Sequence, residues 1–273
     1  QTYRALTNGV SYFFQLNIKK HMSHKVVIFC GGKGTRIREM SEKVPKALIH
    51  VEGDPLIIHL MRYYAKHGIK DFILCLGYKS SIFKEFFTQK IYKDSEIISI
   101  NQGVVNTDKS EMDDWNVSLV DTGIEATIGE RLLHVKDLLK GEKYFFATYG
   151  DALSDIDPYI ALKLMENDDK LVASISGVRS KQTYHVVNSD KKGMVLSIDN
   201  TVSMDFRING GYMCLKNEIF DYLNPGEELV VEAFDRLISE RKLHVYHHNG
   251  AWYSMDTYRD HIEMTKAFKK GII

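Results

Sequence analysis

The chain has few cysteines and no long apolar run. Its three cysteines (Cys30, Cys75 and Cys214) each lie inside an apolar stretch without C-x-x-C spacing. This placement predicts small buried side chains in a reducing compartment, and it argues against disulfide and zinc roles. No apolar stretch approaches the roughly twenty residues that a membrane helix requires, and no signal-peptide pattern is present. We therefore expect a cytoplasmic protein without a membrane partner.

The chain also lacks an excess of either charge. Its 273 residues include 36 basic and 36 acidic side chains, well mixed along the sequence, so nothing predicts a nucleic-acid partner. An apolar content of 44% is ordinary for a globular protein with a sizeable core. No internal repeat or Pro/Ser-rich linker divides the chain. We expect a single domain over residues 23–273, preceded by a non-native or upstream-translated leader at residues 1–22.

Apolar runs alternate with stretches of helical period, which is the pattern of an α/β fold. We predict a Rossmann-like, mixed, mostly parallel sheet flanked by helices. Asp54 and Asp157 each precede a proline and are expected to cap helices. Between residues 179 and 215, short alternating strands predict a small antiparallel β subregion on the acceptor side. The expected strands are 26–30, 72–76, 144–148, 171–178 and 243–248, and the expected helices are 54–67, 80–87, one from Pro158, 228–241 and 258–269.

A glycine-rich run follows the first strand. Glycines let backbone amides turn toward one anion, Arg36 would add a planar fork for phosphate oxygens, and Lys46 a compact point charge. Neither a Walker loop nor a dinucleotide fingerprint fits the spacing. We predict a phosphate cradle, and the structural alternative is a plain turn. The run is Gly31-Gly32-Lys33-Gly34-Thr35-Arg36, with Pro45-Lys46 downstream.

Two distant aspartates are candidate ligands of a divalent cation. Asp151 follows the apolar strand at 144–148, and Asp256 lies between a strand and the last predicted helix. Ligands of open parallel sheets bind at the carboxyl ends of strands, where the glycine run also falls. A hard cation bound with a triphosphate takes one or two carboxylates together with phosphate oxygens. The alternatives are a turn aspartate for Asp151 and a helix cap for Asp256.

Five segments, in order and at similar spacing, together resemble the sugar-1-phosphate nucleotidyltransferases, most closely the glucose-1-phosphate cytidylyltransferase branch. The resemblance runs from about Lys25 to the C-terminus, and segment 115–123 points to the cytidylyl branch. It implies Mg²⁺-dependent attack of a sugar 1-phosphate, by default α-D-glucose 1-phosphate, on CTP. The products would be pyrophosphate and a CDP-sugar for surface polysaccharide, and the enzyme would be a homo-oligomer. The segments are GGKGTR with Pro45-Lys46, WNVSLVDTG (115–123), TYGD (148–151), NGGY (209–212) and MDT (255–257).

The resemblance also implies roles for individual residues. Catalysis is expected from Arg36, Lys46 and Asp151, and Mg²⁺ binding from Asp151 and Asp256. Asn209, Gly210, Arg179 and Arg207 are weaker candidates for contacts with the acceptor. The expected nucleotide contacts are Phe29, Cys30, Gly31, Gly32, Lys33, Gly34, Thr35, Arg36, Lys46, Ser118, Gly123 and Gly150.

One stretch departs from the family pattern. Asp199-Asn200-Thr201 stands where the family usually has Glu-Lys-Pro, whose lysine contacts the sugar phosphate. The open alternatives are therefore nucleotidyl transfer to another phosphorylated acceptor and a non-catalytic nucleotide-binding regulatory protein. Trp115 has two alternatives as well, contact with the nucleotide or packing in the core. The histidines are expected to be structural or exposed.

Overall fold

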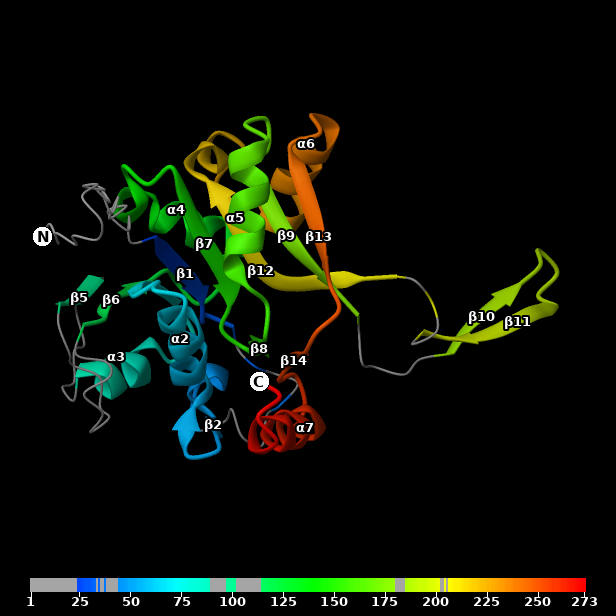
Figure 1. The fold of residues 1–273 in the computed structure, drawn as a ribbon, viewed down its shortest axis with the longest axis horizontal. Coiled ribbons are helices and arrows are strands. Elements are labelled where there is room, and N and C mark those ends of the chain that lie inside the picture. Colours follow the sequence, from blue (N-terminus) through cyan, green and yellow to red (C-terminus); the bar gives the residue numbers. More distant parts are fainter. Residues whose placement is uncertain are drawn as a thin grey trace, which may run out of the picture.

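The computed structural model describes residues 24–32, 34, 37, 44–88, 97–101, 114–179, 185–201, 204 and 206–273. Its centre is an eight-stranded sheet in the order β13-β9-β12-β7-β1-β4-β6-β5 (Figure 1). Strand β1 is parallel to β4 and β7, β4 to β6, and β9 to β13. Strand β12 runs antiparallel to β7 and β9, and β5 runs antiparallel to β6. The predicted mixed, mostly parallel α/β sheet is thus confirmed.

The elements have the following bounds. The central strands are β1 (Lys25–Phe29), β4 (Asp71–Leu76), β5 (Ile97–Asn101), β6 (Asn116–Asp121), β7 (Tyr144–Tyr149), β9 (Ala173–Val178), β12 (Ile208–Lys216) and β13 (Leu243–His248). The short pairs are β2 (His50–Val51) with β3 (Asp54–Pro55), β8 (Ala152–Ser154) with β14 (Trp252–Ser254), and β10 (His185–Ser189) with β11 (Val195–Asn200). The α-helices are α2 (Leu56–Lys66), α3 (Ser80–Thr88), α4 (Ile128–His134), α5 (Pro158–Asn167), α6 (Phe234–Ser239) and α7 (Tyr258–Lys269), and the short helices are η2 (Lys46–Leu48), η4 (Lys136–Leu139), η6 (Asn217–Asp221) and η7 (Leu229–Ala233).

Helices cover both faces of the sheet with apolar side chains. Leu60 of α2, Phe83 of α3 and Leu162 of α5 pack on one face. Leu132 of α4 and Leu237 of α6 pack on the other. A strand buried on both sides has no polar face, which explains why β1, β4 and β7 are nearly continuous apolar runs. None of the described helices has the length and apolar character needed to cross a membrane.

Of the two predicted helix caps, one is confirmed and the other is wrong. Asp157 caps α5 as predicted, because its side chain accepts a hydrogen bond from the Tyr159 amide. The prediction for Asp54 was wrong: the residue before α2 is Pro55, without a side-chain cap. Asp54 instead lies in β3 and pairs with Arg62 at 2.7 Å. The carboxylate thus forms an ion pair with a residue eight positions further along the chain.

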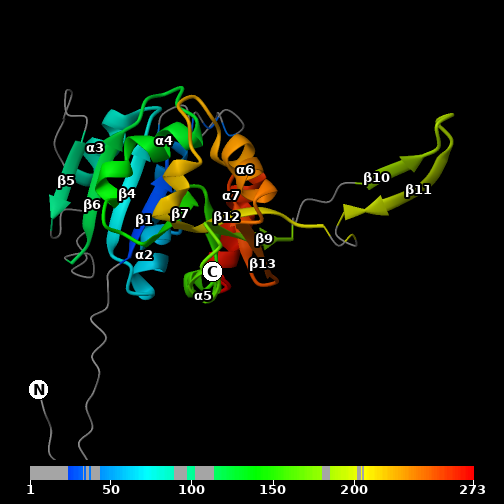
Figure 2. The same cartoon turned by 90° about the horizontal axis from the view of Figure 1, so that it is seen from above.

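The predicted antiparallel subregion divides into two parts. Strands β10 and β11 form a separate hairpin that extends away from the body (Figures 1 and 2). Strand β12, by contrast, belongs to the central sheet and is buried from Gly210 to Lys216. It is antiparallel to both of its neighbours, β7 and β9, and burial on both faces is consistent with this central position. The range 179–215 is therefore not one structural unit.

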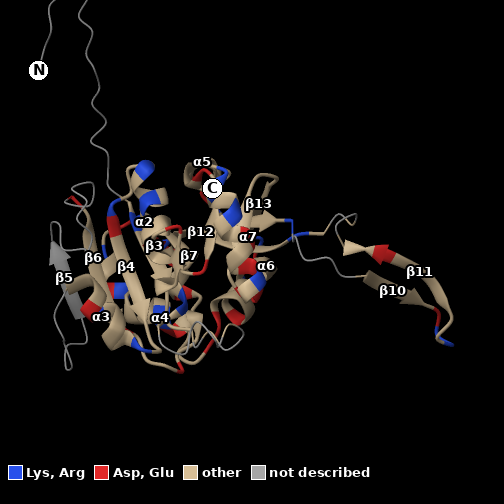
Figure 3. Ribbon diagram, turned by 90° about the horizontal axis from the view of Figure 1, so that it is seen from below, with Lys and Arg blue, Asp and Glu red and all other residues tan. Residues whose placement is uncertain are grey.

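Two composition-based expectations can also be compared with the fold. All three cysteines are free and buried, as predicted. Basic and acidic residues are interspersed along the described part of the ribbon (Figure 3), as the balanced composition leads one to expect. The proposed leader, residues 1–22, lies outside the described residues.

Candidate active site

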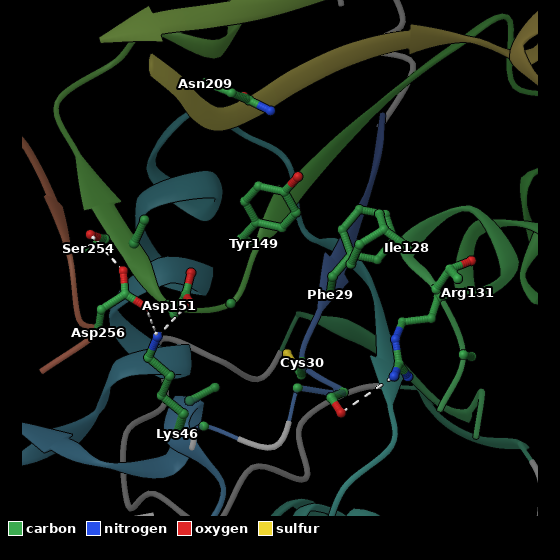
Figure 4. Close-up of a pocket in the computed structure, with 18 of the residues that line it drawn as sticks. Phe29, Cys30, Lys46, Ile128, Arg131, Tyr149, Asp151, Asn209, Ser254 and Asp256 are labelled. Atoms are coloured by element: carbon green, nitrogen blue, oxygen red, sulfur yellow. Dashed lines mark hydrogen bonds and ion pairs between the residues drawn. The ribbon is translucent and has the colours of Figure 1, made fainter. Parts of the chain in front are cut away.

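A cavity of about 720 Å³ opens where β1, β6 and β7 end at the same edge of the sheet (Figure 4). Its walls come from the loop after β1, the loop between β6 and α4, the loop after β7, the start of β12 and the segment after β14. Such a site, at the carboxyl ends of parallel strands, is where ligands of open α/β sheets bind. The lining residues used below are Phe29, Cys30, Gly31, Gly32, Gly34, Lys46, Arg131, Tyr149, Gly150, Asp151, Asn209, Gly210, Glu228, Trp252 and Asp256.

Lys46 lies between the two predicted metal ligands. Its Nζ donates to Asp151 Oδ2 at 2.8 Å and to Asp256 Oδ1 at 2.9 Å. The lysine side chain is 14% exposed and the two carboxylates 35% and 21%, so water screens these ion pairs only partly. The fold therefore brings together three residues that were predicted to act at one site and that come from three distant segments of the chain.

Backbone pairing explains how Asp151 and Asp256 become neighbours. Asp151 lies between β7 and β8, and Asp256 follows β14, which runs antiparallel to β8. The Met255 amide donates to the Asp151 carbonyl at 2.9 Å and extends this pairing into the site. Thr257, not Asp256, caps α7, in a capping box with Asp260. The alternative role of Asp256 as a helix cap is therefore excluded.

The two carboxylates fit the chemistry of a Mg²⁺ site. They contact one ammonium, so they face a common point where a cation is already stabilised. Mg²⁺ is commonly held by one or two carboxylates and completes its shell with water and substrate phosphates. Among the described residues no group of three His, Cys, Asp or Glu side chains could hold a metal. Asp151 and Asp256 could hold such an ion together with water and substrate phosphates.

The glycine run reaches the cavity through the residues that the structure describes. Gly31, Gly32 and Gly34 line it, and Gly34 has a φ of 60°. A Cβ on Gly32 would meet no atom within 4 Å, so a ligand can approach its backbone closely. Lys33, Thr35 and Arg36 lie outside the described residues, and their expected roles stay predictions.

Gly150 is held directly against the first strand. Its amide donates to the Phe29 carbonyl at 3.0 Å, and a Cβ at this position would lie 2.8 Å from Cys30 Sγ. Only glycine therefore fits without displacing the thiol. Burial raises the pKa of Cys30 well above the ordinary thiol value, with further contributions from Cys75 and Asp151. Burial therefore disfavours the thiolate, which is the nucleophilic form of cysteine.

Neutral polar groups line the end of the cavity near β12. Tyr149 and Asn209 face the same space (Figure 4). Burial raises the pKa of Tyr149 to about 12, with contributions from Asp151 and Glu228, while a hydrogen bond with Asn209 opposes the shift. The phenol is therefore uncharged at physiological pH. The Trp252 indole donates to the Gly210 carbonyl at 2.8 Å and fixes this wall.

Four other predicted residues do not line this cavity. Ser118 lies in the interior of β6, and Gly123 lies in a neighbouring depression beside Ile124. Arg207 donates to the carbonyls of Gly177 and His248 and to Asn249 Oδ1. Arg179 is exposed directly after β9. Their proposed contacts with ligands stay predictions.

Burial and contacts decide between the alternative roles of Trp115 and test the expectation for the histidines. Trp115 is 2% exposed and packs against Phe72 with ring centroids 5.1 Å apart, so it is a core residue. His59 is buried and donates to the Val51 carbonyl, while His50 and His247 are exposed. These placements agree with structural or exposed roles.

Sequence reasoning missed Arg131. This residue of α4 is 3% exposed and lines the cavity beneath the glycine run. Its Nη2 lies 3.4 Å from the Gly31 carbonyl (Figure 4). Charged residues are almost never fully buried. An arginine on a short helix is therefore expected at the surface, and the sequence did not indicate that Arg131 lines the cavity.

Comparisons with known proteins bear on this site. A family model described as nucleotidyl transferase matches residues 25–270. The chain is 31% identical over 250 residues to the probable glucose-1-phosphate cytidylyltransferase of Bacillus subtilis (strain 168), covering 90% of this chain and 97% of that protein. It is likewise 31% identical to the glucose-1-phosphate cytidylyltransferase of Salmonella typhimurium, covering 90% and 96%. The crystal structure of HddC from Yersinia pseudotuberculosis superposes with a TM-score of 0.64 at 20% identity, covering 90% of this chain and 99% of that one.

Proposed function

Because the chain belongs to the nucleotidyl transferase family, we propose that it transfers a cytidylyl group from CTP to a sugar 1-phosphate, by default α-D-glucose 1-phosphate, and releases pyrophosphate. The contact of Lys46 with both Asp151 and Asp256 is the observation that supports this most directly. It places a cation and two carboxylates that would bind metal beside a glycine-rich backbone, in a cavity whose volume falls in the usual range for small-molecule sites.

The reaction requires positioning more than proton transfer. A sugar phosphate oxygen attacks the α-phosphorus, and the bond from that phosphorus to the pyrophosphate oxygen breaks. The attacking phosphate is already an anion near neutral pH, so no side chain must act as its general base. Asp151 and Asp256 would hold Mg²⁺, which when bound screens the triphosphate charge and favours departure of pyrophosphate.

Other residues of the chain have separate tasks in this proposal. The Lys46 ammonium would exchange a carboxylate for a phosphate oxygen, and the amides of Gly31 and Gly32 would face the triphosphate. Tyr149 and Asn209 would bind acceptor hydroxyls as uncharged partners. The preference for CTP is supported by the cytidylyltransferase relatives at 31% identity. Homo-oligomeric assembly, a cytoplasmic location and a role in surface polysaccharide synthesis stay predictions.

The second candidate is nucleotidyl transfer to a different phosphorylated acceptor. Asp199 and Asn200 belong to β11 in the protruding hairpin and do not line the cavity. In the described part of the lining, Lys46 and Arg131 are the cations. The contact that the family's lysine would make with an acceptor phosphate is thus not supplied by this stretch, which favours an altered acceptor.

A screen that varies both the nucleoside triphosphate and the acceptor tests the proposal. CTP, UTP, GTP and dTTP are each combined with a panel of phosphorylated acceptors and Mg²⁺, and pyrophosphate release is followed. We expect CTP with glucose 1-phosphate to give the highest rate. A faster reaction of CTP with another phosphate would favour the second candidate. Binding of CTP without pyrophosphate release for any acceptor would favour a regulatory protein and contradict the proposed enzyme.

A further inference from the structure

The guanidinium of Arg131 connects loops from three different strands. Arg131 belongs to α4, and its side chain reaches the carboxyl ends of the central strands. Among the described residues, the guanidinium donates hydrogen bonds to five neutral oxygens, and four of these are backbone carbonyls. The contacts are Nη1 with Leu76 O at 3.0 Å, Thr122 Oγ1 at 2.7 Å and Gly123 O at 2.9 Å, and Nη2 with Gly31 O at 3.4 Å and Ile124 O at 3.3 Å.

These acceptors mark the carboxyl ends of three adjacent parallel strands. Gly31 follows β1, Leu76 ends β4, and Thr122 follows β6. One side chain therefore fixes the spacing between the glycine run and the loop after β6, which both contribute to the cavity wall. A planar group with five N–H donors suits this task, whereas an ammonium could serve only some of these oxygens.

Two glycines make room for the guanidinium. A Cβ on Gly31 would lie 2.0 Å from Arg131 Nη1, and one on Gly77 would lie 2.8 Å from the same atom. Any side chain at Gly31 would thus have to displace Arg131. The first glycine of the run is therefore needed for this contact in addition to any approach of a ligand.

The charge of Arg131 is buried without a recorded ion pair among the described residues. Burial lowers its pKa, while Cys75, Cys30, Asp121 and Glu228 act in the opposite direction. Asp121 is itself engaged with Ser80 and Lys84, and Glu228 accepts from the Ile128 amide. Burying a cation without a contacting carboxylate is costly. A cation at the floor of an anion-binding cavity would recover part of that cost when the anion binds.

We propose that Arg131 is a positioning residue for the nucleotide: it holds the ends of β1, β4 and β6 in the arrangement that receives a nucleoside triphosphate, and its charge favours that anion. This inference rests on the proposed function of the same cavity. It predicts that Arg131 governs the affinity for nucleotide much more than the affinity for the acceptor, whose expected contacts lie near β12.

The test compares Arg131→Met and Arg131→Lys with Arg62→Met. Arg62 is a suitable control because it is also largely buried in an ion pair, on α2 and outside the cavity lining. For Arg131→Met we expect the KM for CTP to rise at least about tenfold, with the KM for the acceptor changed less than about twofold. Arg131→Lys should recover part of this loss. Arg62→Met should lower the melting temperature but leave both KM values unchanged.

The other possible outcomes also support or contradict the proposed role of Arg131. If Arg131→Met lowers only the melting temperature, Arg131 is merely structural and the inference is wrong. If that variant does not fold, Arg131→Lys and Gly31→Ala are compared, and both must weaken CTP binding measured by calorimetry. If the wild type binds CTP but releases no pyrophosphate, the proposed function fails while CTP affinity still tests Arg131. If the wild type binds none of the four triphosphates, both are overturned.

Discussion

The Lys46 ammonium and the Asp256 carboxylate lie 2.9 Å apart, although 210 positions separate them in the chain. Asp151 contacts the same nitrogen from a third segment. In this arrangement one positive charge offsets two negative ones in a partly buried site. A second cation could join the carboxylates only if the ammonium moved away or shared them. The triad therefore links the binding of metal to the position of Lys46.

Replacing Lys46 should make the site bind metal more tightly in the absence of nucleotide. In Lys46→Met the two carboxylates lose their shared partner, and their mutual repulsion favours any divalent cation. We expect the affinity for Mn²⁺ alone to rise at least about tenfold, measured by titration calorimetry, while pyrophosphate release is lost. Lys66→Met, at an exposed position on α2, is the matched control. An unchanged Mn²⁺ affinity in Lys46→Met would contradict this linkage.

Asp151→Asn should abolish most turnover while the fold survives. The amide keeps the shape of the side chain but removes the charge that would hold Mg²⁺, so we expect the rate to fall at least about 100-fold. The melting temperature should change little, because Asp151 is partly exposed. Asp155→Asn is the control, since Asp155 lies just after β8, pairs with His248 and does not line the cavity. Near-wild-type turnover in Asp151→Asn would remove this residue from the mechanism.

Gly150→Ala should be rescued by a change at Cys30. The added methyl would meet Cys30 Sγ at 2.8 Å, and overpacking of this kind costs about 1–3 kcal/mol of stability. In the double variant Cys30→Ala/Gly150→Ala the sulfur is absent, so the two effects should not add. Chemical denaturation of the four proteins in this cycle measures the coupling. Strict additivity would show that the two positions do not interact.

Stability should decrease in mild acid because of His59. Burial is the largest cause that lowers the pKa of this imidazole below its ordinary value of 6.5, and Arg62 adds to it, while Asp54 and the Val51 carbonyl act in the opposite direction. Below pH 6.5 the unfolded chain binds a proton that the folded protein resists, so the free energy of unfolding falls as pH drops through this range. Wild type should therefore lose more melting temperature than His59→Gln between pH 7.5 and pH 5.5. Equal losses in the two proteins would point to other groups.

The sequence predicted most of the fold because β1, β4 and β7 are buried on both faces and thus appear as apolar runs. The strand Leu243–His248 and the helix Tyr258–Lys269 have the predicted bounds. Asp54 was misassigned because its preference for a cap was outweighed by an ion pair with Arg62, a contact that depends on the register of the helix. The placement of β12 depended on burial of both its faces, which short alternating patterns do not reveal.

The candidate site was predictable to the extent that its residues follow strand ends. Gly31, Gly150 and Asp151 all do, and parallel strands bring such positions to one edge. Arg131 could not be found in this way, because its role arises from the distance between three loops that only the assembled sheet defines. Asp256 was identified from its place between a strand and the last helix, and the pairing of β14 with β8 explains how it reaches Asp151.

The pairing of β14 with β8 has a consequence for biosynthesis. Lys46 precedes Asp151 and Asp151 precedes Asp256 in the chain, so the three residues leave the ribosome in that order. A nascent chain could form much of the sheet and still lack the second carboxylate. A premature stop upstream of Asp256 would therefore yield a polypeptide that lacks the second carboxylate of the site, however much of the sheet it can form.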